Sequence, residues 1–198
     1  MSLPRFIYLY LTLIALSAYD VFSRNVILEF KGSYLLPTNE QFRAAYHNGN
    51  GLYGPELTAQ IKSNWYGFIG GDYLQKNGRY LGPSNATKLR LLPFTFGVKY
   101  FIPASDQLDF YIGLGMQTAY MHTKKQRGFV ITKSSFCGLG GMAKVGAYIK
   151  LDHNFLLDLF FDYGFMKTHK GDFYGYTYSP LKSKLNNAIF GVGLGYCF

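Results

Sequence analysis

The last residues of the chain alternate between two kinds of side chain, and this pattern limits the folds that the sequence can adopt. From Ala188 to Phe198 every second residue is apolar or aromatic, and most of the residues between them are glycines. A period of two residues predicts a β-strand that presents one set of side chains on each face. A soluble sheet would bury such an apolar face under a second layer. The pattern instead runs to a terminal aromatic residue, and we expect its apolar face to meet lipid.

The composition agrees with a wall that has lipid on one side and water on the other. Aromatic residues make up 19% of the 198 residues and charged residues 16%, and glycines are spread along the apolar segments. Mean hydropathy is zero because each apolar position has a polar or small neighbour. The length fits one domain, and two cysteines are too few for a disulfide framework.

The amino terminus has the parts of a secretory signal sequence. Arg5 gives it a positive start, residues 6–18 form an almost unbroken apolar run, and Ser23 supplies a small residue at the cleavage position. We expect residues 1–23 to be removed and residues 24–198 to form the mature domain. A retained anchor is the alternative, but the run is short for a membrane-spanning helix. No later segment is long and apolar enough to be one.

Eight alternating segments follow, and their connections differ in length. The segments are Asn25–Leu35, Tyr53–Lys62, Trp65–Lys76, Lys88–Ile102, Leu108–His122, Phe136–Leu151, Phe155–Lys167 and Leu185–Phe198. Short connections (Ser63–Asn64, Pro103–Gln107, Asp152–Asn154) take turns with long ones (Pro37–Leu52, Asn77–Thr87, Thr123–Ser135, Thr168–Lys184). We therefore predict an all-β fold, an eight-stranded antiparallel up-and-down transmembrane β-barrel with short periplasmic turns and four longer extracellular loops. A soluble lipocalin-like barrel is the alternative, but the terminal aromatic, the signal sequence and the loop asymmetry favour the membrane.

With these segments the chain resembles the small eight-stranded outer-membrane barrels, namely the OmpA membrane domain and the OmpX/Ail, Opa and OmpW proteins. The resemblance is carried by residues 26–30, 94–100, 111–115 and 193–198. It implies a bacterial outer-membrane location, reached through a Sec-type signal. It also implies that the barrel-assembly machinery recognises Tyr196 and Phe198. The family includes structural anchors, adhesins, narrow channels and a few lipid A enzymes, so the fold does not choose among these functions.

Charged residues at alternate strand positions are expected to point into the barrel. They are Glu29, Lys31, Glu56, Lys62, Asp72, Lys99, Asp109, Lys144, Lys150, Asp158 and Asp162. The lumen of an eight-stranded barrel is only wide enough for side chains to fill it, and buried charges need partners. We therefore expect a lumen plugged by paired charges, in a protein with a structural or surface-interaction role. A narrow OmpW-like channel for small solutes is the alternative. Trp65, Ile69 and Tyr73 are expected to face lipid, with Asp72 inward.

Two sets of residues in the long connections could contact partners. Lys124, Lys125, Arg127, Lys133 and Lys170 form a basic patch suited to the phosphates of lipopolysaccharide. Tyr174, Tyr176 and Tyr178 offer contact surface for a host or surface ligand, as in an adhesin, or extend an aromatic girdle. Nucleic acid is not an expected partner, and we expect a monomer.

Catalysis is not expected. The lipid A enzymes with this fold use a His with a Ser and an acid near the outer rim. Here His122 is followed by Thr123 and Lys124, so the His-x-Ser pattern of the deacylases is missing. No histidines have metal-ligand spacing, and no cofactor or metal is expected. Cys137 and Cys197 are predicted at opposite rims, which excludes a disulfide between them.

Overall fold

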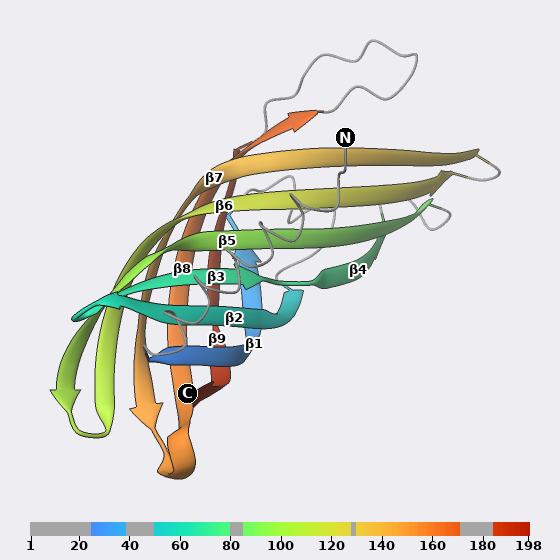
Figure 1. Ribbon diagram of the computed structural model, residues 1–198. Helices are drawn as coiled ribbons and strands as arrows, with labels where there is room; N and C mark the ends of the chain where they lie inside the picture. The colour runs from blue at the N-terminus through green and yellow to red at the C-terminus, as the bar shows by residue number, and fades with distance from the viewer. Residues whose placement is uncertain (1–24, 39–49, 80–84, 128–129, 171–183) are drawn as a thin grey trace, which may run out of the picture.

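The computed structural model describes residues 25–38, 50–79, 85–127, 130–170 and 184–198, which form one antiparallel sheet (Figure 1). Several predicted features lie outside the described residues. They are the expected signal sequence, parts of the long connections between strands, and Tyr174, Tyr176 and Tyr178. The strands are β1 (Val26–Pro37), β2 (Asn50–Lys62), β3 (Trp65–Gly71), β4 (Leu74–Arg79), β5 (Asn85–Ser105), β6 (Leu108–Arg127), β7 (Val130–Lys150), β8 (Phe155–Lys170) and β9 (Lys184–Cys197). Within these residues no helix is long and apolar enough to cross a bilayer.

The sheet closes on itself and confirms the predicted barrel. Its order is β3-β2-β1-β9-β8-β7-β6-β5-β4, and β3 also pairs with β5. β3 and β4 pair with β5 in one continuous register, since Gly71 lies opposite Phe94 and Leu74 lies opposite Leu91. They are two parts of one wall strand, so the barrel has eight strands. The predicted strand over residues 65–76 is thus interrupted at Asp72, which belongs to neither part.

Three tight turns lie at one end of the barrel, which we call the turn end. They join β2 to β3, β5 to β6 and β7 to β8. The ends of the described chain meet there too, because Ile27 lies opposite Cys197. The other end of the barrel, where β1 ends and β2 begins, is called the far end.

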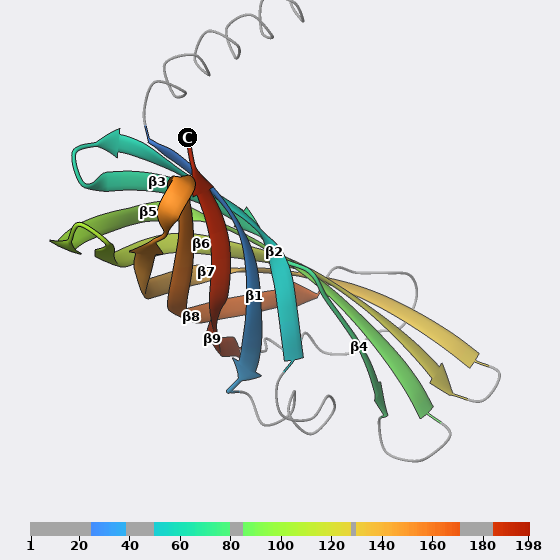
Figure 2. The ribbon, with the colours of Figure 1, turned by 90° about the horizontal axis from the view of Figure 1, so that it is seen from below.

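Strands β5, β6 and β7 are longer than predicted. They span 21, 20 and 21 residues and extend beyond β1 and β2 at the far end (Figures 1 and 2). The prediction of a loop over Thr123–Ser135 is therefore wrong, because only residues 128–129 separate β6 from β7. This segment lacks an apolar alternation, but an antiparallel ladder can continue where water solvates both of its faces. β4 and β5 likewise extend into the predicted loop over Asn77–Thr87, while residues 171–183 separate β8 from β9.

The outer face of the wall is apolar. Its exposed side chains include Phe30 at 58%, Ile69 at 60% and Leu114 at 68% of their full accessible surface. Other members of this belt are Leu28, Leu57, Trp65, Phe94, Phe96, Val98, Ile102, Phe110, Ile112, Leu139, Val145, Leu159, Phe161, Phe165, Phe190, Val192 and Leu194. So large an apolar surface would be unstable in water, and it suits the hydrocarbon of a bilayer. Trp65 and Ile69 lie in the belt, as predicted for the first part of the interrupted strand.

Candidate functional site

The lumen is filled by three successive layers. The first, nearest the turn end, is the aromatic layer of Tyr66, Phe101, Tyr111 and Tyr148. The second is the charge cluster of Glu29, Lys31, Glu56, Lys99, Lys144, Asp158 and Asp162, all buried. The third, toward the far end, is the apolar layer of Leu35, Leu52, Leu74, Leu89 and Leu91, also buried.

Glu56 stands at the centre of the charge cluster. Its Oε1 lies 2.9 Å from the Nζ of Lys31 and 2.6 Å from the Nζ of Lys99, and its Oε2 lies 2.8 Å from the Nζ of Lys144. Lys144 also lies 2.9 Å from Asp162 Oδ2. These contacts connect β1, β2, β5, β7 and β8 across the lumen. One carboxylate thus meets three ammonium groups from three different strands.

Glu29 and Asp158 complete the cluster on its aromatic side. The hydroxyl of Tyr148 donates to Glu29 Oε1 at 2.8 Å, and Lys99 Nζ donates to that hydroxyl at 2.8 Å. The hydroxyl of Tyr111 lies 3.1 Å from Asp158 Oδ1. Lys99 also stands over the Tyr111 ring, 4.6 Å from its centroid. The tyrosines therefore stabilise both the carboxylates and the buried ammonium, through hydrogen bonds and a cation–π contact.

The register explains why these side chains meet. Glu29 lies directly opposite Glu56 in the β1–β2 ladder, a pairing that destabilises a sheet unless cations lie between the two carboxylates. Lys31 and Lys99 supply those cations, because each contacts both carboxylates. Room comes from β9, where a Cβ on Gly193 would stand 3.2 Å from Glu29 Oε2. The glycines of the closing strand thus leave space for the charged side chains of β1.

The other predicted lumen charges lie apart from the cluster. Asp109 pairs with Lys150 at 2.9 Å near the turn end, where the Lys150 side chain is 51% exposed. Asp72 lines a small cavity beside the cluster. Lys62 is exposed at the end of β2 and takes no part in the cluster. The β-bulge between Gln60 and Lys62 ends the regular inward alternation there.

Sequence reasoning missed the apolar layer. Leu52, Leu74 and Leu89 occupy inward positions and are 2%, 1% and 0% exposed. The strand alternation does place them on the inward face, since Leu52, for example, lies on the same strand face as Glu56. An isolated leucine in an alternating strand does not reveal that its neighbours across the lumen are leucines as well. Thr58, on the same strand face as Glu56, is fully buried and accepts a hydrogen bond from Lys99 at 3.4 Å.

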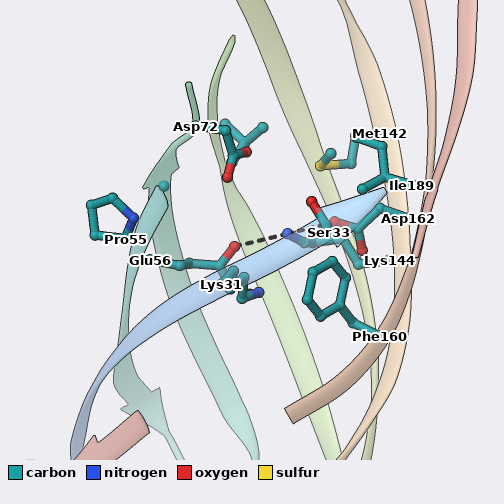
Figure 3. Close-up of a pocket in the computed structure, with 12 residues that line it drawn as sticks. Lys31, Ser33, Pro55, Glu56, Asp72, Met142, Lys144, Phe160, Asp162 and Ile189 are labelled. Carbon is teal, nitrogen blue, oxygen red and sulfur yellow. Dashed lines mark hydrogen bonds and ion pairs between the residues drawn. The ribbon is translucent and has the colours of Figure 1, made fainter. Parts of the chain in front are cut away.

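A small cavity lies beside the charge cluster (Figure 3). Lys31, Glu56, Lys144 and Asp162 line it from the cluster, and Asp72 lines it from the interruption between β3 and β4. The space open to the centre of a water molecule is about 10 Å³, roughly what one water requires.

The predicted surface residues occupy strands near the far end. Lys124, Lys125 and Arg127 belong to β6, Lys133 belongs to β7, and Lys170 is the last residue of β8. All five residues therefore lie in strands and not in loops, contrary to the prediction. His122 lies on β6 opposite Arg90. Cys137 and Cys197 are free, on β7 and at the end of β9. In the described part of the chain no three His, Cys, Asp or Glu residues are grouped as metal ligands.

Comparison with known proteins identifies the fold. No protein-family model matches the sequence, and no curated protein matches it significantly. Among solved structures, the outer-membrane protein OprG from Pseudomonas aeruginosa is 14% identical, with a TM-score of 0.59 over 88% of this chain and 96% of OprG. Ail, the attachment invasion locus protein of Yersinia pestis, is 9% identical, with a TM-score of 0.55 over 87% of this chain and 99% of Ail. Neisserial surface protein A is 13% identical, with a TM-score of 0.50 over 87% of this chain and 97% of that protein. The chain thus has the fold of the small outer-membrane β-barrels, as the sequence predicted.

Proposed function

We propose that this chain is an integral outer-membrane barrel with a closed lumen, so that its role is structural or is exerted at the cell surface. The observation that carries the proposal is the position of Glu56, whose carboxylate meets Lys31, Lys99 and Lys144 across the lumen. A solute would have to break several of these contacts to pass. Separating buried ion pairs without replacement partners is strongly unfavourable.

The layers on either side of the cluster support the same conclusion. Toward the turn end, Phe101 and Tyr148 stack with ring centroids 5.2 Å apart, and the Tyr66 centroid lies 4.4 Å from that of Phe101. Toward the far end, the leucines of the apolar layer offer no hydrogen bonds to water or to a polar solute. A narrow OmpW-like channel would need a continuous polar path, and the two flanking layers argue against one.

Liposome swelling tests this proposal. Vesicles that contain the folded protein should swell in a small sugar no faster than protein-free vesicles, whereas vesicles with an open porin should swell rapidly. Migration that changes on heating verifies that the protein is folded. Swelling well above the protein-free rate, in proportion to the amount of folded protein, would overturn the closed lumen and favour the channel.

A second function, contact with lipopolysaccharide phosphates, is favoured by the backbone register near the far end. Lys88 lies directly opposite Lys124, and Lys124 lies directly opposite Lys133. The strand segments 74–79, 85–91, 121–127 and 130–137 contain no acidic residue. Lysines that lie opposite one another on neighbouring strands destabilise a sheet unless anions bind between them. Tyr120, exposed and four residues before Lys124, fits the aromatic girdle beside lipid headgroups.

Binding to lipopolysaccharide micelles tests this second function. Replacing Lys124 and Lys133 by Ser should weaken the binding and reduce its dependence on salt, because fewer phosphates are neutralised. Lys62→Ser at the turn end is the matched control and should bind as the unmodified protein does. Equal binding by all forms would remove the lipopolysaccharide proposal.

The surface role could extend to other ligands. Ail has been solved in complex with the heparin analogue sucrose octasulfate, and the basic strands of this chain have the charge for a similar polyanion. Adhesion through Tyr174, Tyr176 and Tyr178 is a further proposal, and triple replacement by Ser should abolish it.

We also propose export after removal of residues 1–23, assembly through Tyr196 and Phe198, a monomeric state and no catalytic activity. Unaltered lipid A with a His122→Ala variant would agree with the last point.

A further inference from the structure

An open groove lies on the outer face of the barrel beside the interruption between β3 and β4. Pro55 and Gly71 lie at its bottom, and Phe30, Ile69 and Phe94 stand around them with 58%, 60% and 53% of their surface exposed. The groove depends on the missing side chain of Gly71, because a Cβ there would stand 3.2 Å from the Phe94 ring. The outer wall is therefore hollowed at this place.

A cation stands just beyond the edge of the groove that is nearer the far end. Tyr53 and Tyr73 line this edge, with ring centroids 5.7 Å apart. The Tyr73 hydroxyl donates to Gln75 Oε1 at 2.9 Å, and Arg90 Nε donates to the same oxygen at 3.2 Å. A guanidinium has five N–H donors, of which this bond uses one, and Arg90 is exposed. The apolar groove is thus followed directly by a guanidinium that Gln75 holds in place.

Basic residues continue from Arg90 in two rows across β5 and β6. His122 lies directly opposite Arg90, and it belongs to the same strand face as the exposed Tyr120. Lys88 and Lys124 lie opposite one another two residues farther toward the far end, which is about 7 Å along the strands. The first row therefore lies next to the apolar belt, and the second lies beyond it.

The place of the groove and the charges beside it indicate what covers it. The groove belongs to the apolar belt that faces the bilayer, so an acyl chain is the group that meets it. A phosphate at the head of that chain complements Arg90, because a guanidinium can bind phosphate through two parallel N–H bonds. Two rows of basic residues suit a lipid with more than one phosphate, whereas an ordinary phospholipid carries only one.

We propose that this groove and Arg90 form a site for one lipopolysaccharide molecule, with an acyl chain in the groove and a phosphate on Arg90 and His122. The inference rests on the second function proposed above, which assigned phosphates to the lysines of the far end. It adds a site for the lipid part of the same ligand. The site belongs to the outer face and does not depend on whether the lumen conducts.

Retention of diphosphoryl lipid A by the folded protein in detergent tests this site, with native mass spectrometry as the measurement. We expect one lipid A per chain. Arg90→Gln should weaken the binding at least tenfold, because the phosphate loses its guanidinium. Gly71→Leu should weaken it as much, because the new side chain fills the groove. Ala143→Leu enlarges a small exposed residue on β7, Lys62→Ser removes a cation at the turn end, and both controls should bind as the unmodified protein does.

Two outcomes with intact lipids would contradict the proposal. Equal retention of lipid A by the unmodified protein, Arg90→Gln and Gly71→Leu would overturn the site. Phosphatidylglycerol has acyl chains but a single phosphate, and equal retention of this lipid would overturn the assignment to lipopolysaccharide. Heat-dependent gel migration verifies that each variant is folded. If Gly71→Leu does not fold, Arg90→Gln decides.

Deacylated lipopolysaccharide separates this site from the phosphate contact proposed above. It keeps phosphates but has no acyl chains, so Gly71→Leu should not change its binding, whereas replacing Lys124 and Lys133 by Ser should weaken it. Binding of the deacylated form without retention of lipid A would overturn the groove and leave the phosphate contact in place. Retention of lipid A that depends on Arg90 but not on the two lysines would support the groove and remove their contact.

Discussion

The charge cluster in the middle of the lumen and the apolar layer beyond it bury different kinds of side chain. The charge cluster buries lysines and carboxylates that contact one another across the barrel, whereas the apolar layer buries only leucines. Burial of leucine is favourable in itself. Burial of a charge is favourable only while its partners remain in place. We therefore expect the loss of a single group to destabilise the protein more in the charge cluster than in the apolar layer, although both occlude the same lumen.

Removal of the central carboxylate should have the largest effect. Glu56→Gln leaves Lys31, Lys99 and Lys144 without their shared anion. The free energy of unfolding should fall by about 4 kcal/mol, as expected when one partner of a buried ion pair is lost. Urea unfolding of protein refolded into vesicles measures this change, with Asp106→Asn as the control. A loss below about 1 kcal/mol would show that the cluster tolerates an uncompensated charge.

Truncation in the apolar layer should have a slightly smaller effect. Leu89→Ala creates a cavity at a fully buried site and should reduce the free energy of unfolding by about 3 kcal/mol. Leu114→Ala is the matched control, because Leu114 is 68% exposed on the outer face and lipid can fill the space. The same unfolding measurement applies to both variants. Equal losses would contradict the assignment of one leucine to the lumen and the other to lipid.

A methyl group added beside the cluster should have a moderate effect. In Gly193→Ala the new Cβ would stand 3.2 Å from Glu29 Oε2 and 3.3 Å from Lys31 Cγ, so both side chains must shift. We expect a loss of about 1 kcal/mol, as for mild overpacking. Gly32→Ala is the control, because no atom lies within 4 Å of its added Cβ. A Gly193→Ala variant as stable as Gly32→Ala would mean that the cluster has free room.

The pair near the turn end should contribute least. Lys150 contacts Asp109 at 2.9 Å, but its side chain is 51% exposed. Lys150→Met should lower the free energy of unfolding by less than about 1 kcal/mol, with a smaller difference at high salt. Lys144→Met, inside the cluster, should cost several times more. Similar losses for the two lysines would remove the distinction between buried and exposed pairs.

The alternation of the sequence predicted all seven members of the charge cluster but not how they pair. Glu29, Lys31 and Glu56 were expected inward because each lies between outward apolar residues. Their contacts depend on the register of strands that are distant in sequence, and that register places Glu29 opposite Glu56. No local pattern shows that one carboxylate will contact three lysines.

Two structural features could not be predicted from the alternation. The interruption at Asp72 lies between Gly71, which pairs with β5, and Tyr73, which still pairs with Tyr53 of β2, and no break in the alternation marks it. The strand extension over Lys124 to Lys133 depends on backbone hydrogen bonds between polar segments, which leave no apolar period to detect. The strand extension bears on the proposed contact with phosphate.

Single-channel recording in planar bilayers tests the closed lumen most directly. The folded chain should give no discrete current steps above those of a protein-free bilayer, because the cluster and its two flanking layers fill the cross-section. A fully folded sample, verified by heat-dependent gel migration, is required for that comparison. Discrete and reproducible steps from the unmodified protein, with a conductance altered by Glu56→Gln, would contradict the closed lumen and show that the buried charges line a pore.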